Sequence, residues 1–199
     1  MALYATPKSE ILWHGKKYRL NLSVSRVLKS IEILTAQEIC EVDKVRTVLS
    51  LLVKGSSPQD PSFLDAVFSV LKKGDSQKGK KQFDFFQDEA LIYSAFLQVY
   101  QIDLHKESKK MHWFDFINLL SGLPKGTRFS DVIEIREADV PKLNSRNAES
   151  VRKLQELKAK FALKTPLANT PADISKELET LYATLAQQAE VNKCRTLAK

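Results

Sequence analysis

Apolar residues recur every three or four positions along most of this 199-residue chain, which is the spacing of one face of an amphipathic helix. The spacing changes to two only near the N-terminus, where Tyr18, Leu20 and Leu22 alternate with polar residues. The turn-forming pair His14 and Gly15 precedes them, so we predict a β-hairpin near residues 11–22. The predicted fold class is therefore mainly α: a compact multi-helix domain with a small N-terminal β-hairpin.

Three helices are expected between the hairpin and residue 74. Their apolar stripes cover residues 24–34, 39–52 and 64–71. Thr35 and Glu38 have the spacing of a capping box, which predicts that the second helix starts there. Asp60 followed by Pro61 predicts the start of the third helix, because proline fits the first helical position, where its missing N–H costs nothing.

We expect residues 83–141 to form most of the core. Asp84 and Gln87 have the spacing of a capping pair and predict a helix from about residue 83 to residue 101. Its apolar residues are Phe86, Ala90, Tyr93, Leu97 and Tyr100 on one face and Ile92, Phe96 and Val99 on another. A helix that is apolar on two faces is expected at the centre of a domain, with neighbours on several sides.

Two further elements are predicted before Pro141. The apolar spacing indicates a helix from about residue 111 to residue 121, which we expect to end with Gly122 in the left-handed conformation. Residues 129–136 are predicted to form a short amphipathic helix, with a buried strand at residues 132–135 as the alternative.

Asn147 is expected to cap a helix that runs to about residue 164. Its apolar side is expected to contain Val151, Leu154, Leu157 and Phe161. Two pairs of opposite charge, Glu149 with Lys153 and Glu156 with Lys160, have the spacing of ion pairs on the helix surface.

One domain is expected over residues 1–164, with a mobile lysine-rich loop at residues 72–81 that contains no apolar residue. A linker and a C-terminal amphipathic helix are expected over residues 165–199. This last helix carries apolar residues four, three and four positions apart, at Ile174, Leu178, Leu181 and Leu185. They could pack on the protein's own core or dock on a partner.

The chain carries a formal net charge of +7. Two groups of basic residues supply much of it, namely Lys72, Lys73, Lys78, Lys80 and Lys81 in the loop, and Arg152, Lys153, Lys158, Lys160 and Lys164 in the helix after Asn147. Basic residues can bind the phosphates of nucleic acid, but exposed ones often only keep a protein soluble. We therefore favour solvated surfaces, and nucleic-acid binding through these two groups is the alternative.

No feature of the sequence indicates secretion or a membrane. The two cysteines, Cys40 and Cys194, are too few for a disulfide framework, and Cys40 lies in a helical pattern in which we expect a buried, inert thiol. The first residues lack the layout of a signal peptide, and no apolar run approaches the ~20 residues of a membrane span. We expect a cytoplasmic protein with no membrane partner.

The most suggestive polar cluster consists of Asp103, His105 and Glu107, with His112 and Asp115 farther along. A metal site needs several ligands that converge on one point from rigid elements. These residues alternate along a lysine-rich segment, so we expect no metal site. The sequence also has no Gly-rich phosphate loop, nucleophile elbow or metalloprotease helix. We therefore expect no catalytic, cofactor-binding or metal-binding residues and no enzymatic activity.

Several motifs resemble those of a bacteriophage protein family. They lie in residues 90–104, which end in Tyr100-Gln101-Ile102-Asp103-Leu104, in residues 110–117 with His112-Trp113, in residues 119–124 with Gly122-Leu123-Pro124, in residues 132–136, and in the hairpin with Gly15, Lys16 and Tyr18. This set resembles the Gp-fifteen family of long-tailed phages and prophages of Gram-positive bacteria. An Asp-Phe-Arg of that family is replaced here by Ser23-Val24-Ser25-Arg26. The resemblance covers about residues 10–164.

The resemblance implies a protein of the tail module that acts as a tail assembly chaperone and has no catalytic residues. It implies that the partner is the tail tape measure protein, a companion tail chaperone, or both. It also implies a location in the cytoplasm of the bacterial host, outside the mature virion. The alternative function is a basic nucleic-acid-binding accessory protein of a phage or prophage.

Overall fold

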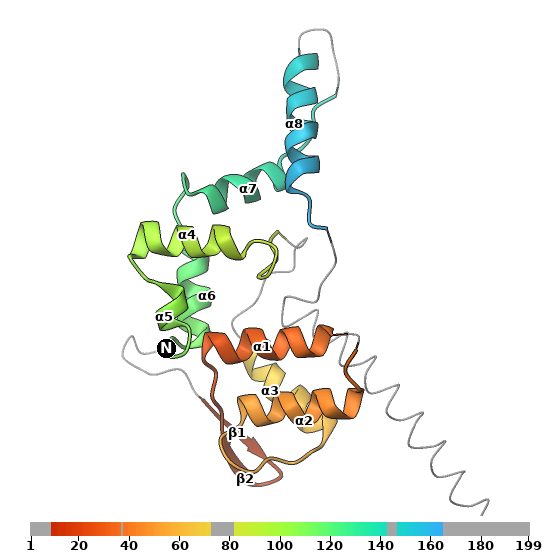
Figure 1. The fold of residues 1–199 in the computed structure, drawn as a ribbon, viewed down its shortest axis with the longest axis vertical. Helices are drawn as coiled ribbons and strands as arrows, with labels where there is room; N and C mark the ends of the chain where they lie inside the picture. The colour runs from red at the N-terminus through yellow and green to blue at the C-terminus, as the bar shows by residue number, and fades with distance from the viewer. Residues whose placement is uncertain (1–8, 37, 73–81, 143–146, 165–199) are drawn as a thin grey trace, which may run out of the picture. The chain divides into compact units, whose positions relative to one another are not determined.

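The computed structural model describes residues 9–36, 38–72, 82–142 and 147–164. They form two strands, β1 (Glu10–Trp13) and β2 (Lys16–Arg19), and eight helices, namely α1 (Val24–Thr35), α2 (Glu41–Leu52), α3 (Pro61–Lys72), α4 (Glu89–Tyr100), α5 (Leu104–Glu107), α6 (Trp113–Ser121), α7 (Arg128–Glu137) and α8 (Ala148–Phe161) (Figure 1). The predicted fold, mainly α with a small N-terminal hairpin, is confirmed. Among the described helices, none has the length and apolar character that a membrane crossing needs.

The described residues divide into two compact units. Unit 1 contains β1, β2, α1, α2 and α3 together with residues 108–117. Unit 2 contains α4, α5, α7 and α8 together with the second half of α6. The chain therefore passes from unit 1 to unit 2, returns to unit 1 for residues 108–117, and leaves it again within α6.

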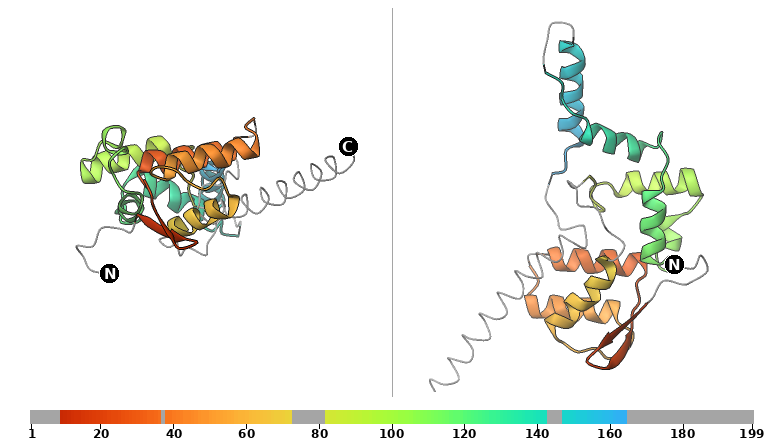
Figure 2. Two further views of the ribbon diagram at one scale, coloured as in Figure 1. Left: turned by 90° about the horizontal axis from the view of Figure 1, so that it is seen from below. Right: turned by 180° about the vertical axis from the view of Figure 1, so that it is seen from behind.

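The hairpin turns at the two residues that the sequence indicates. His14 and Gly15 both have positive φ angles, 45° and 76°, as the favoured two-residue hairpin turns require. One face of the hairpin packs on α3, where the ring of Phe63 contacts the rings of Trp13 and Tyr18 at centroid distances of 5.6 and 4.8 Å. The hairpin lies at the margin of unit 1 (Figure 1, Figure 2).

The core of unit 1 lies among α1, α2 and α3. Its fully buried side chains include Val27, Ile31, Val48, Leu49, Phe63 and Phe68. Residues 111–113 join this core, since the Met111 carbonyl accepts the Val24 amide at 3.1 Å and the Trp113 amide donates to the Leu22 carbonyl at 2.8 Å. The Trp113 side chain is buried, so the His-Trp motif contributes to the core of unit 1.

The predicted start of α2 at Thr35 is wrong. Thr35 is the last residue of α1, and its hydroxyl donates to the Ile31 carbonyl at 3.1 Å within the same helix. A threonine hydroxyl can bond back to the preceding turn as well as cap a following helix, and here the first bond forms. The N-cap of α2 is Cys40, which is exposed, so the expectation of a buried thiol is also wrong.

The predicted start of α3 is confirmed. Pro61 is the first residue of the helix, and the Asp60 carboxylate accepts the Ser62 amide at 2.8 Å. The side-chain cap satisfies one of the amides that a helix start leaves without an intrahelical partner.

The helix at the centre of the apolar stretch begins later than predicted. The Asp84 carboxylate accepts the amides of Phe86 and Gln87 at 2.8 and 2.9 Å, but these bonds close a separate turn, and α4 starts at Glu89 with Asp88 as its N-cap. Only one of the two expected faces is buried, at Ile92, Ala95 and Phe96. On the other face Tyr93 is half-buried and Leu97 is 45% exposed. The expectation that both faces are covered is therefore wrong for the face that contains Tyr93 and Leu97.

Gly122 does not adopt the predicted left-handed conformation. The glycine with positive φ in this region is Gly126, at 88°, in the turn before α7. A Cβ atom on Gly122 would lie 3.3 Å from the hydroxyl oxygen of Tyr100, which donates to the Leu119 carbonyl at 2.8 Å. A side chain at residue 122 would therefore crowd the Tyr100 hydroxyl and the Asn118 carbonyl, whereas the backbone angles of Gly122 do not require glycine.

The segment after Gly126 is the predicted helix, and the alternative of a strand is wrong. Thr127 caps α7 in a reciprocal box with Ser130, since each residue's hydroxyl accepts the other's amide at 3.2 Å. Phe129 and Val132 form the buried side of α7.

Helix α8 begins after Asn147 as predicted, but the Asn147 side chain forms no capping hydrogen bond, and its Nδ2 donates to the Lys142 carbonyl at 2.9 Å. Val151 is buried, and Leu154, Leu157 and Phe161 on the same side are half-buried. The ion pair on its surface is Arg152–Glu156, at 3.2 Å, in place of the two predicted pairs. Glu156, which was expected to pair with Lys160, thus pairs with Arg152 one turn earlier in the helix.

Three predictions fall outside the described residues. They concern the lysine-rich loop, of which only residue 72 is described, the linker and C-terminal helix at residues 165–199, and Cys194. The domain boundary at residue 164 stays a prediction.

Candidate functional site

The most prominent polar site of unit 2 is an ion pair between Asp88, at the start of α4, and Arg136, near the end of α7. The pair is bidentate, with Arg136 Nη1 2.6 Å from Asp88 Oδ2 and Arg136 Nη2 2.8 Å from Asp88 Oδ1. The side chain of Arg136 is only 10% exposed and that of Asp88 only 3%. A buried pair of this geometry fixes both the distance and the relative orientation of the two elements that carry it.

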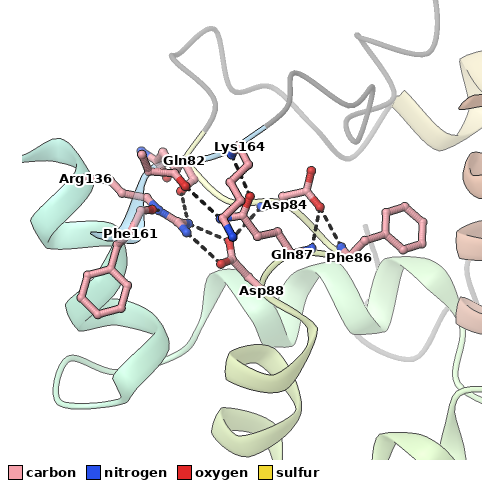
Figure 3. Close-up of polar contacts among 9 residues, drawn as sticks. Gln82, Asp84, Phe86, Gln87, Asp88, Arg136, Phe161 and Lys164 are labelled. Carbon is pink, nitrogen blue, oxygen red and sulfur yellow. Dashed lines mark hydrogen bonds and ion pairs between the residues drawn. The ribbon is translucent and has the colours of Figure 1, made fainter. Parts of the chain in front are cut away.

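Backbone groups form further hydrogen bonds with the pair (Figure 3). Arg136 Nε donates to the Phe161 carbonyl at 2.7 Å, and Nη1 donates to the Gln82 carbonyl at 3.0 Å. The Asp84 amide donates to Asp88 Oδ2 at 3.0 Å. Arg136 therefore joins the turn before α4, the start of α4 and the end of α8.

Helices α7 and α8 cap each other's C-terminal ends. Arg136 of α7 donates to the last residue of α8, as described above. In return, Lys158 Nζ of α8 donates to the carbonyls of Ile135, Arg136 and Ala138 at 3.2, 2.8 and 2.6 Å, where α7 ends. The carbonyls at a helix end lack intrahelical donors and carry partial negative charge, so a cation there is stabilising.

Gln87 holds the chain where it leaves α8. Its side-chain Nε2 donates to the Ala162 carbonyl at 2.9 Å, and its Oε1 accepts the Lys164 amide at 2.9 Å. The amide side chain thus pairs with the backbone as a neighbouring strand would. We refer to Asp84, Gln87, Asp88, Arg136 and Lys158 together as the α4–α7–α8 junction; Figure 3 shows the first four of these residues.

The geometry of the junction is that of a structural site. The Asp88 carboxylate and the Arg136 guanidinium bond to each other and to backbone groups, and Lys158 is bonded to three carbonyls. A catalytic acid or base must reach a substrate atom with a proton or lone pair to exchange. Here the charged groups are directed at partners within the protein, and the arrangement stabilises unit 2.

Asp103 and its neighbours form a helix start. Asp103 Oδ1 accepts the His105 amide at 3.1 Å, and Oδ2 pairs with Lys106 Nζ at 3.0 Å. The hydrogen bond from Lys106 lowers the pKa of Asp103. The His105 ring lies against the ring of Tyr93, with centroids 4.4 Å apart. In the part of the chain that the structure describes, no three His, Cys, Asp or Glu side chains come together as a metal site.

His112 is half-buried in unit 1 and acts as a cap. Its Nδ1 accepts the Phe114 amide at 3.3 Å at the start of α6, which places the ring proton on Nε2, 3.1 Å from the Ser9 hydroxyl. Burial lowers the pKa of His112, and the Asp115 carboxylate opposes this shift. The neutral ring is therefore the form that fits the folded protein.

Unit 1 should lose stability when the pH is lowered, because His112 remains neutral in the folded chain while the unfolded chain takes up a proton near pH 6.5. The free energy of unfolding should fall as the pH drops through the unfolded value and should stop falling below the lower folded value. His112→Asn keeps an acceptor for the Phe114 amide but cannot titrate. We expect urea unfolding at pH 7.5 and pH 5.5 to show a smaller difference in this variant than in the original chain. Equal differences would exclude His112 as the source.

The basic residues of α8 do not act as one surface. Lys158 is bonded to carbonyls of α7, whereas Arg152, Lys153 and Lys160 are exposed. Arg152 is moreover paired with Glu156. Of the helix residues named for nucleic-acid binding, Lys158 is therefore already bonded within the protein. The lysine-rich loop named for the same function lies outside the described residues, apart from residue 72.

Sequence reasoning missed the buried pair because its partners are 48 residues apart. The local pattern around Asp88 predicts a negative charge near a helix start, and the pattern around Arg136 predicts the polar side of a short amphipathic helix. Neither pattern predicts that the two meet. One signal could have indicated a buried cation. Arg136 lies among apolar residues in a helix, α7, whose hydrophobic face is narrow.

The chain matches the family model described as Bacteriophage Gp15 protein over residues 8–163. Searches of curated proteins and of solved structures found no match to this chain. The matched region contains every helix and strand described above, the core tryptophan of unit 1 and the complete ion-pair site of unit 2. This extent indicates a phage protein with a role in phage structure or assembly, and the chain belongs to the Bacteriophage Gp15 protein family.

Proposed function

We propose that this protein is a non-enzymatic tail assembly chaperone. It binds the tail tape measure protein, directly or with a companion tail chaperone, in the cytoplasm of the bacterial host, and it is absent from the mature virion. The observation that carries the proposal is the match to a phage protein family over residues 8–163, together with the tail-module role that the resemblance implies.

The charged groups described above make their contacts within the fold. Asp84 accepts an amide of the turn before α4, Asp88 accepts the Asp84 amide, Asp103 accepts an amide at the start of α5, and Lys158 caps the end of α7. These charges stabilise turns and helix ends.

The client-binding surface that we propose is the apolar stripe of the C-terminal segment. Residues 165–199 lie beyond the region that the family model matches, and their apolar residues have the spacing of a helix that docks in a groove. The competing explanation is that these leucines complete the protein's own core, as single amphipathic helices often do.

Co-expression with the cognate tape measure protein should test both parts of this proposal. We expect the full chain to keep the tape measure protein soluble and to co-purify with it. A chain that ends at Lys164 should lose most of this effect, because it lacks the proposed apolar surface. The measurement is the soluble fraction of the tape measure protein and its recovery with the chaperone.

A matched pair of variants separates the apolar surface from the mere presence of the segment. Replacing Leu178 and Leu185 with serine should reduce recovery of the client as the truncation does. Replacing Lys176 and Glu179 with serine, at polar positions of the same segment, should not. If the full chain neither binds nor solubilises the client, alone or with its companion chaperone, the proposed function is wrong. If the truncated chain binds equally well, only the placement of the surface is wrong.

A further inference from the structure

The backbone N–H and C=O groups of successive residues in β1 point to opposite sides of the strand, and one hydrogen bond shows which residues face β2. The Leu20 amide donates to the Ser9 carbonyl at 2.6 Å, so residues 9, 11 and 13 direct their N–H and C=O groups toward β2. The backbone groups of Glu10 and Leu12 consequently face away from β2. They form the outer edge of the sheet.

The two edges of the sheet differ. On the β2 side the Arg19 carbonyl accepts the Lys54 amide at 2.8 Å, and Leu20 bridges to Val53, so that edge is partly covered. On the β1 side, within the described residues, no hydrogen bond engages the outward backbone groups of Glu10 or Leu12. None of the described residues therefore occupies the outer edge of β1.

The side chains at this edge are unlike those of a protected edge. Natural sheets usually guard an open edge with charged residues, especially lysine. Here the central outward residue is Leu12, whose side chain is 66% exposed and is the most exposed large apolar side chain among the described residues. The carboxylate of Glu10 is paired with Arg19 at 3.4 Å, which reduces its charge toward an incoming strand.

A second copy of β1 fits this edge in one register. Antiparallel pairing about Ile11 places Glu10 of each copy opposite Leu12 of the other, so four backbone hydrogen bonds form and no like charges are directly opposed. Shifting the register toward the N-terminus would oppose the two Glu10 carboxylates. Shifting it toward the turn would leave only Leu12 opposite Leu12, with two hydrogen bonds. The centred register also brings the two Ile11 side chains together on the face that packs toward α3.

We propose that the outer edge of β1 is a self-association surface, through which two copies of this chain form a four-stranded antiparallel sheet with two-fold symmetry. The order of strands is β2–β1–β1–β2, and the new contact is isologous. Four residues per strand bury little area, so the dimer is weak, with a dissociation constant on the order of 100 µM. This proposal does not depend on the chaperone function.

Variants that place a negative or a positive charge at residue 12 test the register, because each charge has opposite effects on the stability of the hairpin and on the stability of the dimer. In one copy, residue 12 lies opposite Lys17; in the dimer, it lies opposite Glu10 of the other copy. Leu12→Glu should therefore strengthen the hairpin but weaken self-association by about tenfold or more, whereas Leu12→Lys should weaken the hairpin but preserve or strengthen the dimer. The double change Glu10→Lys with Leu12→Glu should restore association.

Sedimentation velocity of the full chain at concentrations from about 20 µM to about 1 mM is the appropriate measurement. Leu12→Pro provides a second variant, because it removes the outward N–H and leaves the bonds to β2 intact. We expect it to abolish association. Ile11→Pro is its matched control for stability, since it removes an inward N–H and should lower the melting temperature much more than Leu12→Pro does.

Two results would overturn the proposal. One is a chain that remains monomeric over the whole concentration range. The other is a dimer whose dissociation constant is the same in Leu12→Glu, Leu12→Lys and Leu12→Pro, which would place the contact elsewhere. Salt gives an additional readout: raising the ionic strength should strengthen this dimer, because it screens the repulsion between two chains of net charge +7.

Discussion

Replacing Arg136 with methionine is expected to lower the free energy of unfolding by about 3–5 kcal/mol. The substitution leaves the Asp88 carboxylate buried without its cation, and it removes the donors to the Phe161 and Gln82 carbonyls. A buried charge without a partner costs much more than an ion pair contributes, because the desolvation penalty remains. Urea unfolding, followed by circular dichroism at neutral pH, measures the loss.

Arg152→Met is the matched control for this prediction. It is the same substitution in an arginine that also forms an ion pair, but its side chain is 83% exposed. Exposed pairs contribute about 0–1 kcal/mol, so this variant should be close to the original chain. Adding Asp88→Asn to Arg136→Met should recover part of the loss, because the buried charge is then removed. If Arg136→Met and Arg152→Met were equally stable, the buried pair would not stabilise unit 2.

Phe96→Ala is expected to cost about 3–5 kcal/mol in the free energy of unfolding. Phe96 is fully buried on the covered face of α4, and its ring contacts the ring of Tyr100 at a centroid distance of 5.6 Å. Truncation removes this apolar area from the core and leaves a cavity that the neighbours fill only in part.

The next residue of α4 supplies the control. Leu97→Ala deletes an apolar side chain from the exposed face of the same helix and should change the free energy of unfolding by less than about 1 kcal/mol. Tyr93→Ala should fall between the two, because Tyr93 is half-buried and its ring lies on His105. A loss at Phe96 no larger than that at Leu97 would mean that α4 does not bury this face.

The elements of this fold could be predicted because they depend on local periodicity. The change of period near Tyr18 marks the hairpin, and Asp60 with Pro61 marks the start of α3. The errors concern residues with two equally local uses. Thr35 could cap α2 or bond back into α1, and either Asp84 or Asp88 could begin α4.

The candidate site could not be predicted, because it depends on which helices become neighbours. The hydrogen bonds of Arg136 reach residues 25 to 54 positions away, and those of Lys158 depend on where α7 ends. Gly122 illustrates the same limit. Its position after α6 predicts a left-handed cap. In the structure the space for a side chain at this position is limited by the hydroxyl of Tyr100, a residue of α4.

The return of residues 108–117 to unit 1 has a consequence for synthesis on the ribosome. Trp113 and the Met111 carbonyl complete the core that begins with Leu22 and Val24, so unit 1 cannot finish folding as its own first 72 residues emerge. It must wait until residue 117 has itself left the exit tunnel, and α4 and α5 emerge before that point. Unit 2 waits longer still, because Arg136 needs the Phe161 carbonyl. A nascent chain released before residue 117 therefore contains two incomplete cores, with the apolar side chains of α1 and α4 exposed at the same time.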